Sequence, residues 1–375
     1  MQILGESLEQ LRATRTSVKW RAYPPDVVPV WVAEMDARPC PPVVAAVTDA
    51  LQRGDTGYAW PGALAEAFAG FAKRRWDWSV DPATVSPLPD VMIGIEELLR
   101  ALTPHDGAVV VSPPCYDAFY GFVEAVGHRL VEAPLGADHR LDPDTLDRAF
   151  ADAGQGAAYL LCNPQNPTGT VHTAEELATV ARLADRHGVV VLSDEIHAPL
   201  VMPGVTFTPY LTVPEAARGI AVVSGSKAWN LAGLKVALAV PGAEAGDRLG
   251  RLHEVVTHGV NHLAAIAQTA AYDAGEAWLD QLLTEIGDRR ALLTDLLATH
   301  LPQVEVTPAE ATYLAWLDCS ALGLDDPAAT FLERGRVAVA AGARYDRRAT
   351  QWVRFNLGTS PEMITEAVRR MAVVV

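Results

Sequence analysis

The sequence of 375 residues predicts an α/β fold, in which a mostly parallel sheet is covered by helices and is joined to a smaller α+β domain. Between about residues 100 and 240, short apolar runs alternate with stretches of helical periodicity. Such alternation is typical of βαβ units, whose strands run parallel and whose helices pack on the sheet. Beyond about residue 251 the pattern is largely helical and then gives short strands. We therefore expect a large domain over residues 41–250 and a small domain that combines residues 1–40 with residues 251–375.

Individual elements follow from local signals. Five apolar runs are predicted as strands of the large domain: 108–111, 157–162, 189–192, 220–223 and 236–240. The clearest helix covers 173–187, because Thr173 and Glu176 form a capping box and Gly188 supplies a stop. Helical patterns also cover 41–51, 64–76 and 91–102, whereas prolines make segment 1–40 irregular. Near the C-terminus, strands around 304 and over 313–317, 337–340 and 352–356 precede a helix that starts at residue 361.

Composition narrows the classes of partner. The chain is 50% hydrophobic and 20% charged, and its formal net charge of −16 disfavours nucleic acid and anionic membranes as partners. The segment Met1–Glu6 lacks the basic and apolar blocks of a signal peptide, and no apolar run is long enough to span a bilayer. Cys40, Cys115, Cys162 and Cys319 are scattered without a C-x-x-C pair, which favours reduced thiols over disulfides or zinc. We expect a cytoplasmic protein without a metal site.

Lys227 follows a predicted strand and lies near two serines and a second lysine. The segment Ser224–Lys235 reads Ser-Gly-Ser-Lys-Ala-Trp-Asn-Leu-Ala-Gly-Leu-Lys and comes directly after the strand 220–223. A partly desolvated lysine amine can form a Schiff base with an aldehyde, so Lys227 is a candidate for covalent attachment of a carbonyl cofactor. Ser224, Ser226 and Lys235 are candidates for contacts to a phosphate group. Taken alone, the segment favours a solvated loop lysine over a cofactor site.

Two further loops carry polar residues at the ends of neighbouring strands. Asn163–Gly169 follows the strand that ends at residue 162, and Ser193–His197 follows the strand 189–192. In a parallel sheet these loops converge with the lysine loop on one crevice. Pyridoxal phosphate (PLP) needs an amine for its aldehyde, a carboxylate for its pyridine nitrogen, a donor for its ring oxygen and an aromatic face. Lys227, Asp194, Asn166 and Tyr116 offer these groups in this order.

The ordered motifs identify a family resemblance. Asn-Pro-Gln-Asn-Pro-Thr-Gly, Ser-Asp-Glu-Ile-His, Ser-Gly-Ser-Lys and Arg-Phe-Asn, the last beginning at Arg354, follow one another along the chain. Together they resemble the fold-type I aminotransferase superfamily of PLP enzymes, and within it the cystathionine β-lyase branch of the MalY/PatB type. The resemblance extends from Trp31 to Arg354. It implies the aspartate aminotransferase-like fold of PLP-dependent transferases, a homodimer and PLP as cofactor.

The resemblance also implies roles for individual residues. Lys227 would hold the cofactor and act as the catalytic base, Asp194 would pair with the pyridine nitrogen, and Tyr116 would stack on the ring. Asn166 would contact the ring oxygen and the substrate, and Arg354 would bind the substrate α-carboxylate. The remaining cofactor contacts would come from His197, Ser224, Ser226, Lys235, the backbone N–H groups at Asp90 and Val91, and Tyr58 of a neighbouring subunit.

Two positions depart from the family pattern, and one bears on the reaction. Asp90 stands where relatives usually carry glycine in the phosphate turn, so a carboxylate lies close to a dianion unless it points away or caps a helix. Pro199 stands in a region where relatives tend to have an acidic residue. His197 occupies a position where aminotransferases usually have tyrosine and the lyase branch has histidine. A buried histidine with a purely structural role is the alternative for this residue.

The resemblance implies a carbon–sulfur β-lyase that cleaves L-cystathionine or related cysteine S-conjugates to a thiol, pyruvate and ammonia. Lys227 would remove the Cα proton, and the thiolate would leave from Cβ. The alternative is a PLP-dependent aminotransferase, in which the proton returns to the cofactor and a keto acid is released. A regulatory protein that keeps the fold is a third possibility, which the presence of both Lys227 and Asp194 disfavours. The expected ligand is a small amino acid.

Overall fold

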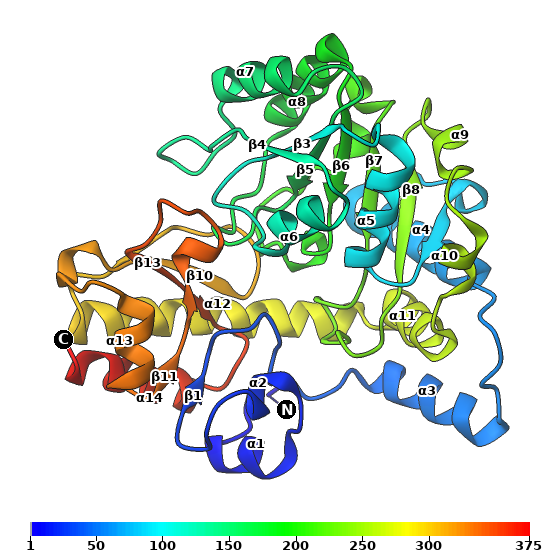
Figure 1. Cartoon of the computed structure of the whole chain (residues 1–375). Coiled ribbons are helices and arrows are strands. Elements are labelled where there is room, and N and C mark those ends of the chain that lie inside the picture. The colour runs from blue at the N-terminus through cyan, green and yellow to red at the C-terminus, as the bar shows by residue number, and fades with distance from the viewer. Residues whose placement is uncertain (1) are drawn as a thin grey trace.

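The computed structural model describes residues 2–375, so residue 1, which opens the predicted segments 1–40 and Met1–Glu6, lies outside the described residues. Its centre is a seven-stranded sheet with the order β2-β8-β7-β6-β5-β3-β4 (Figure 1). The strands are β2 (Ser86–Leu88), β3 (Ala108–Val111), β4 (Arg129–Glu132), β5 (Ala158–Cys162), β6 (Val190–Asp194), β7 (Ile220–Val223) and β8 (Ala237–Pro241). From β4 to β7 neighbouring strands pair in parallel, and β8 is antiparallel to both of its neighbours. The predicted mostly parallel sheet is confirmed, and each of the five predicted strands is present within two residues of its expected bounds.

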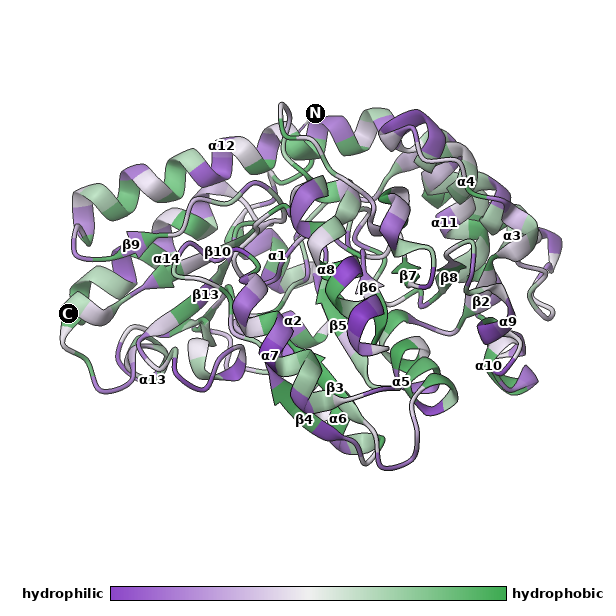
Figure 2. Ribbon diagram, turned by 90° about the horizontal axis from the view of Figure 1, so that it is seen from above, coloured by the Kyte–Doolittle hydropathy of each residue, from purple (hydrophilic) through white to green (hydrophobic). Residues whose placement is uncertain are grey.

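Helices cover both faces of this sheet, because successive strand residues point to opposite sides. Val109, Leu160 and Val222 pack on one face with α5 (Val91–Leu102) and α6 (Ala118–Ala125). Val110 and Tyr159 pack on the other face with α7 (Pro143–Ala153) and α8 (Ala174–His187). Figure 2 shows the strands as mainly hydrophobic and the surrounding helices as mixed. This two-sided burial explains why the strands appear in the sequence as continuous apolar runs.

Several predicted helices are confirmed together with the local signals that define them. In α8 the side chain of Thr173 accepts from the backbone N–H of Glu176, the Glu176 carboxylate accepts from the N–H of Thr173, and Gly188 ends the helix with φ 67°. Helices α3 (Pro41–Arg53) and α4 (Gly62–Trp76) also lie where the sequence predicts them. Two short helices, α9 (Gly246–Leu249) and α10 (Glu254–His258), follow the sheet and lead to α11 (His262–Ala274) and the long α12 (Glu276–His300).

A second sheet lies toward the C-terminus, beside α12 (Figure 1). Its four strands are antiparallel in the order β12-β13-β10-β9. They are β9 (Glu305–Val306), β10 (Leu314–Asp318), β12 (Ala340–Ala341) and β13 (Trp352–Asn356), and the helices beside them are α13 (Pro327–Glu333) and α14 (Pro361–Val373). The N-terminal segment reaches this region through β1 (Val28–Pro29), which pairs in parallel with β11 (Val337–Ala338). Because α11 packs on α3 and α4, the domain boundary near residue 250 stays a prediction.

The N-terminal segment is more regular than its prolines predict. It contains α1 (Leu8–Thr14) and α2 (Val18–Arg21) ahead of the prolines at 24, 25 and 29. A capping box starts α1, since Ser7 accepts from the backbone N–H of Gln10 and the Gln10 side chain accepts from the N–H of Ser7. The expectation of an irregular segment was wrong for these residues. Within residues 2–375, every helix is too short or too polar to cross a membrane.

A buried ion pair lies within the N-terminal segment, and a hydrogen bond from Thr359 joins it to the C-terminal part of the chain. Lys19 Nζ lies 2.7 Å from Asp36 Oδ2, and the two side chains are 0% and 1% exposed. The Asp36 carboxylate also accepts from Trp20 Nε1 at 2.9 Å and from Thr359 Oγ1 at 2.6 Å. A buried ion pair of this kind is tolerated because further hydrogen bonds satisfy the charged groups. The network holds the segment 31–36, of which Ala33 lines the cavity described next.

Candidate active site

A cavity of about 210 Å³ lies at the carboxyl edge of the large sheet. The loops after β3, β5, β6 and β7 meet there, as expected for the ends of parallel strands. Most of the predicted cofactor residues line it, namely Asp90, Val91, Tyr116, Asn166, Asp194, His197, Ser224, Ser226, Lys227 and Lys235. The fold therefore brings together side chains that are up to 145 positions apart, as in the contact between Asp90 and Lys235.

Lys227 lies on the loop after β7, and its amine is held against the segment 31–36. Its Nζ donates to the backbone oxygen of Ala33 at 2.9 Å, and Tyr313 Oη donates to the same oxygen at 2.9 Å. Removal from water lowers the pKa of Lys227 to about 8, and the nearby Arg354 guanidinium acts in the same direction. About a tenth of the amine is therefore neutral at pH 7 and about half at pH 8, and attack on an aldehyde requires this neutral form.

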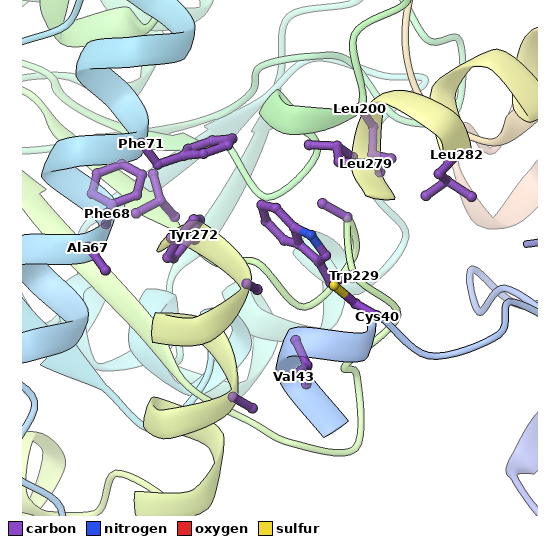
Figure 3. Packing of buried hydrophobic residues seen from close by; sticks show 14 of the residues in the cluster. Cys40, Val43, Ala67, Phe68, Phe71, Leu200, Trp229, Tyr272, Leu279 and Leu282 are labelled. Atoms are coloured by element: carbon purple, nitrogen blue, oxygen red, sulfur yellow. The ribbon is translucent and has the colours of Figure 1, made fainter. Parts of the chain in front are cut away.

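The lysine loop is anchored by Trp229, two residues further on. Figure 3 shows the Trp229 indole within a cluster of buried residues that includes Phe71 and Tyr272. The ring centroids of Phe71 and Tyr272 lie 5.6 and 5.4 Å from that of Trp229, and Trp229 Nε1 donates to Gly275 O at 3.1 Å. Aromatic packing of this kind, with the indole N–H satisfied, holds a side chain in one position. The backbone that carries Lys227 is thereby fixed against α4 and α11.

Asp194 ends β6, and its carboxylate lines the cavity. Its Oδ1 accepts from the backbone N–H of Ile196 at 3.1 Å. Burial raises the pKa of Asp194 to about 6, while the hydrogen bond from Ile196 and the charge of Lys227 act in the opposite direction. A cationic group placed beside this carboxylate would favour its ionised form, and a protonated pyridine nitrogen is such a group.

His197 follows on the same loop and is 4% exposed. Burial lowers the pKa of His197 to about 3, with Lys227 and Arg354 adding to the shift, so the imidazole is neutral at physiological pH. Its Nδ1 is buried without a hydrogen-bond partner among the described residues. A buried ring nitrogen without a partner in a cavity wall is available for a hydrogen bond with a polar ligand.

Arg354 lies in β13, and its guanidinium reaches the same region from the second sheet. It is 4% exposed, and it donates to Asn166 Oδ1 at 3.2 Å and to Trp31 O at 3.1 Å. The guanidinium carbon lies 4.7 Å from the centre of the Tyr345 ring, close enough for a cation–π contact. Its Nε has no partner among the described residues. A buried guanidinium with a spare donor is suited to a carboxylate ligand.

Tyr116 forms a further wall of the cavity. Its hydroxyl lies 3.7 Å from Met92 Sδ, and its ring packs edge-on against Phe119 with 5.6 Å between centroids. Burial raises the pKa of Tyr116 above its ordinary value, so the phenol stays neutral. The edge contact with Phe119 leaves the position of the Tyr116 ring defined before any ligand enters.

The carboxylate of Asp90 caps α5. Of the two arrangements expected for it, close to the phosphate or capping a helix, the structure shows the cap. Its Oδ1 accepts from the backbone N–H of Ile93 at 2.8 Å, and its Oδ2 accepts from Lys235 Nζ at 2.6 Å. The N-terminus of α5 at Val91 remains part of the cavity wall. A helix N-terminus attracts anions. Here the negatively charged carboxylate of Asp90 already binds one N–H group of this terminus and the amine of Lys235.

The two serines of the lysine loop differ in what they can offer a phosphate group. Ser224 Oγ donates to Val236 O at 2.8 Å and accepts from the backbone N–H of Ser226 at 3.2 Å, so its proton is already used within the loop. Ser226 lines the cavity and its hydroxyl has no hydrogen-bond partner among residues 2–375. Ser226 is therefore the better placed of the two to donate to an anion.

We expect the Asp90→Asn variant to bind PLP about two- to tenfold more tightly than the unmodified protein. Asparagine caps a helix as well as aspartate does, while the change removes a charge that repels a phosphate and frees Lys235. Fluorescence titration of the cofactor-free protein measures the dissociation constant. Asp90→Ala is the control, since it also loses the cap at a cost of about 1 kcal/mol of stability. Weaker binding by Asp90→Asn would show that the carboxylate assists the site.

Tyr58 does not lie in this cavity. Its side chain is 99% exposed, and Trp60 beside it is 86% exposed. Both line a separate hollow of about 910 Å³ together with Pro61, Pro87 and His258. Within one chain, therefore, Tyr58 is the one predicted cofactor residue that the described structure leaves apart from the others.

The residues of the cavity fit PLP. Lys227 supplies an amine of lowered pKa for the aldehyde, Asp194 a buried carboxylate for the pyridine nitrogen, and Tyr116 an aromatic wall. The cavity end at α5 offers a helix N-terminus and Ser226 for a phosphate. Residues 2–375 contain no group of three or more His, Cys, Asp or Glu side chains arranged to hold a metal ion. The amine, the carboxylate, the aromatic wall and the phosphate-binding end together match an organic cofactor with a phosphate tail.

The comparison with protein families agrees with this geometry. The model of the family described as aminotransferase class I and II matches residues 28–371. The chain belongs to this family. The three converging loops and Arg354 all lie within the matched residues.

Individual relatives carry lyase names. A protein of Mycobacterium leprae (strain TN), provisionally named a cystathionine β-lyase, is 47% identical over 97% of this chain and 96% of its own length. A Corynebacterium glutamicum protein named cystathionine β-lyase is 35% identical over 98% of each chain. The solved structure of a Corynebacterium diphtheriae protein, provisionally described as a PLP-dependent β-cystathionase, superposes with a TM-score of 0.93. It is 34% identical and covers 100% of this chain and 99% of its own. The aspartate aminotransferase-like fold predicted for this family member is confirmed.

Some members of the site had no signal of their own in the sequence. Ala33 contributes only a backbone oxygen, which accepts from Lys227 and from Tyr313. Tyr345 contributes the face of its ring to Arg354. The motif Trp-Val-Ala-Glu-Met-Asp, which begins at Trp31, marks the wall segment in the sequence, but its partners could be found only in the folded chain.

Proposed function

We propose that the chain is a PLP-dependent carbon–sulfur β-lyase, which cleaves L-cystathionine or related cysteine S-conjugates to a thiol, pyruvate and ammonia. The observation that carries the proposal is the single cavity in which Lys227, of lowered pKa, lies with the carboxylate of Asp194. The buried, partly unsatisfied guanidinium of Arg354 adjoins it and supports binding of an amino-acid carboxylate. Relatives with lyase names over nearly their full length support the reaction type.

The residues divide the work of this reaction. When bound, PLP supplies an electron sink for the bond that breaks at the substrate Cα. Arg354 orients the substrate through its α-carboxylate, and Lys227, in its neutral form, takes the proton from Cα. The Cβ–S bond then breaks, and the electron pair leaves with the sulfur as a thiolate. Water completes the balance by hydrolysing the remaining three-carbon fragment to pyruvate and ammonia.

A second candidate is an aminotransferase, which the description of the matching family favours. The two reactions share the removal of the Cα proton and differ in what leaves. To test them, the holoenzyme is incubated with L-cystathionine, with and without an added keto acid, and pyruvate, thiol and new keto acid are quantified. The lyase predicts equal amounts of pyruvate and thiol without an acceptor. New keto acid formed only with an acceptor, and no thiol, would contradict the lyase and favour the aminotransferase.

We expect the rate of PLP incorporation into the cofactor-free protein to rise with pH and to reach half of its maximum near pH 8. The reacting form of Lys227 is the neutral amine, and its pKa is lowered to about 8, so the reactive fraction grows as pH increases through that value. Stopped-flow absorbance at a series of pH values gives the profile. A midpoint near the ordinary lysine pKa of about 10.4 would contradict the lowered pKa.

We further propose a homodimer in which Tyr58 serves the cofactor site of the partner subunit. The role of Tyr58 follows from the family resemblance, and the two adjacent exposed aromatic side chains Tyr58 and Trp60, which line one hollow, support an interface there. Sedimentation equilibrium at micromolar protein concentration tests the assembly, with twice the chain mass as the expected result. A monomer at every concentration would contradict it.

Tyr58→Phe should weaken PLP retention about three- to tenfold without changing the melting temperature. The substitution removes one hydroxyl donor to the phosphate and keeps the ring, so the assembly should survive. Dialysis of the holoenzyme against buffer, followed by absorbance, measures the retained cofactor. Tyr23→Phe is a matched control, because Tyr23 does not line the cofactor cavity. Equal retention by both variants would argue against the role of Tyr58.

We also propose a cytoplasmic location. The support is that Cys40, Cys115, Cys162 and Cys319 are all free and buried. Free buried thiols are the usual state of cysteine in a reducing compartment. Fractionation of cells that produce the protein, with a cytoplasmic marker enzyme measured in parallel, tests this location.

A further inference from the structure

A second cavity opens from the candidate active site toward the surface. Its volume is about 500 Å³, and it shares the walls Ala33, Met92, Tyr116 and Lys227 with the cofactor cavity. Its outer part is lined by α13 and by the residues around β12, including Ala328, Leu332 and Val339. A substrate held at Arg354 and Lys227 would extend its leaving group into this space.

Three cationic side chains and the two carboxylates of Asp117 and Asp326 line the second cavity, and the proposed reaction uses only two of the cations. Lys227 and Arg354 act on the amino-acid end of the substrate, whereas Arg344 has no assigned task. Arg344 lies in a short 3₁₀ turn, Gly342–Arg344, and its side chain is 60% exposed. In a chain with a formal net charge of −16, a cation placed in a ligand cavity favours an anionic ligand there.

The guanidinium of Arg344 is held by one edge and open on the other. Its Nε and Nη2 lie 2.9 and 2.6 Å from Asp117 Oδ2. Within residues 2–375, Nη1 has no hydrogen-bond partner. A guanidinium has N–H donors on two edges, so one carboxylate can orient it while a second one binds. Asp117 therefore positions Arg344 without exhausting its donors.

The turn that carries Arg344 is fixed independently of the Asp117 contact. Tyr345 O accepts from the backbone N–H of Cys115 at 3.0 Å and from Tyr120 Oη at 3.3 Å. A side chain at Gly342 would collide with the backbone oxygen of Ala349, so the turn is closely packed. These contacts already join the turn to the segment that contains Cys115 and Tyr120. The ion pair between Arg344 and Asp117 is therefore not required to hold the turn in place.

We propose that Arg344 binds a carboxylate on the leaving group of the substrate, so that the site selects cysteine S-conjugates whose thiol portion carries an acid. The proposal rests on the function proposed above and specifies its substrate class. In a substrate such as L-cystathionine, Arg354 would bind the α-carboxylate and Arg344 would bind the carboxylate of the leaving group. Ala328, Leu332 and Val339 would contact the methylene groups between them.

The test compares three substrates of similar length with the Arg344→Gln holoenzyme. L-cystathionine carries a carboxylate and an ammonium group on its leaving group, S-(3-carboxypropyl)-L-cysteine carries the carboxylate alone, and S-propyl-L-cysteine carries neither. We expect kcat/KM to fall about 10- to 100-fold for the first two substrates, since a charge-assisted hydrogen-bonded contact is lost. For S-propyl-L-cysteine we expect less than about a twofold change, because no contact to Arg344 is involved.

Arg347→Gln is the matched control. Arg347 is exposed, and its guanidinium carbon lies 5.7 Å from the centre of the Tyr120 ring, outside the residues that line the cavity. Its kinetics should match those of the unmodified enzyme with all three substrates. An equal loss with all three substrates in Arg344→Gln, or no loss with any, would overturn the proposal. If the unmodified enzyme released no pyruvate or thiol from any of the three substrates, the lyase function itself would fail, which is a separate outcome.

Discussion

Lys227→Ala should lower turnover of L-cystathionine by at least about 1,000-fold. The change removes both the amine that holds the cofactor and the base that takes the Cα proton, and a positioned base alone contributes about 10²–10⁴-fold. Pyruvate release by the purified variant, reconstituted with PLP, measures the effect. The visible absorbance that arises from covalent attachment should be lost at the same time. The variant should remain folded, because Trp229 and the cluster around it anchor the loop.

Lys235→Ala is the control for this experiment. Lys235 lines the same cavity, but its amine is bound to Asp90 and its side chain is 58% exposed. The variant should keep the covalent bond and lose mainly cofactor affinity. If Lys227→Ala kept a tenth or more of the activity, or if Lys235→Ala lost the absorbance instead, the assignment of the attachment point would be wrong.

Asp194→Asn should lower turnover by about 10²–10³-fold while leaving covalent attachment of the cofactor intact. The amide keeps the shape and the contact with the Ile196 N–H, but it cannot stabilise a protonated pyridine nitrogen by its charge. Turnover and the absorbance spectrum of the reconstituted variant are therefore measured together. Near-normal turnover would contradict the role given to Asp194.

Glu195→Gln provides a matched comparison, because Glu195 is the neighbouring buried carboxylate. It accepts from Asn163 Nδ2 at 3.2 Å, from Ser193 Oγ at 3.0 Å and from the Tyr210 backbone N–H at 2.7 Å. These contacts join the loop after β6 to the loop after β5 and to the turn that begins at Tyr210. The glutamine amide oxygen can accept from the same three donors, so the variant should lose less than about 1 kcal/mol of stability and keep the spectrum of the unmodified protein. The comparison would thus show that Asp194 acts on the cofactor, whereas Glu195 only binds neighbouring protein groups.

Much of the large sheet could be predicted from the sequence, because both faces of its strands are buried. Burial on two sides produces continuous apolar runs, and the parallel runs β3, β5, β6 and β7 end in loops at the same sheet edge. That is why the sequence alone places Asn166, Asp194 and Lys227 in one crevice. The antiparallel direction of β8 and the edge strands β2 and β4 left no comparable pattern.

Contacts between distant segments could not be predicted, because they depend on side-chain direction in the folded chain. The sequence left open whether Asp90 opposes a phosphate or caps a helix, and the structure shows the cap and a bond to Lys235. The pairing of Lys19 with Asp36, which fixes the wall behind Lys227, had no sequence signal at all. Helix α1 could have been found, since the capping box of Ser7 and Gln10 is a local signal.

Mapping the point of cofactor attachment tests the account most directly. The holoenzyme is reduced with borohydride, which makes the bond between the lysine and PLP permanent, and is then digested and analysed by mass spectrometry. The account predicts that the cofactor mass is found on the peptide containing Ser224–Lys235, specifically on Lys227 and not on Lys235. Modification of another lysine, or a protein that binds no PLP, would contradict the central claim that this cavity is a PLP site built around Lys227.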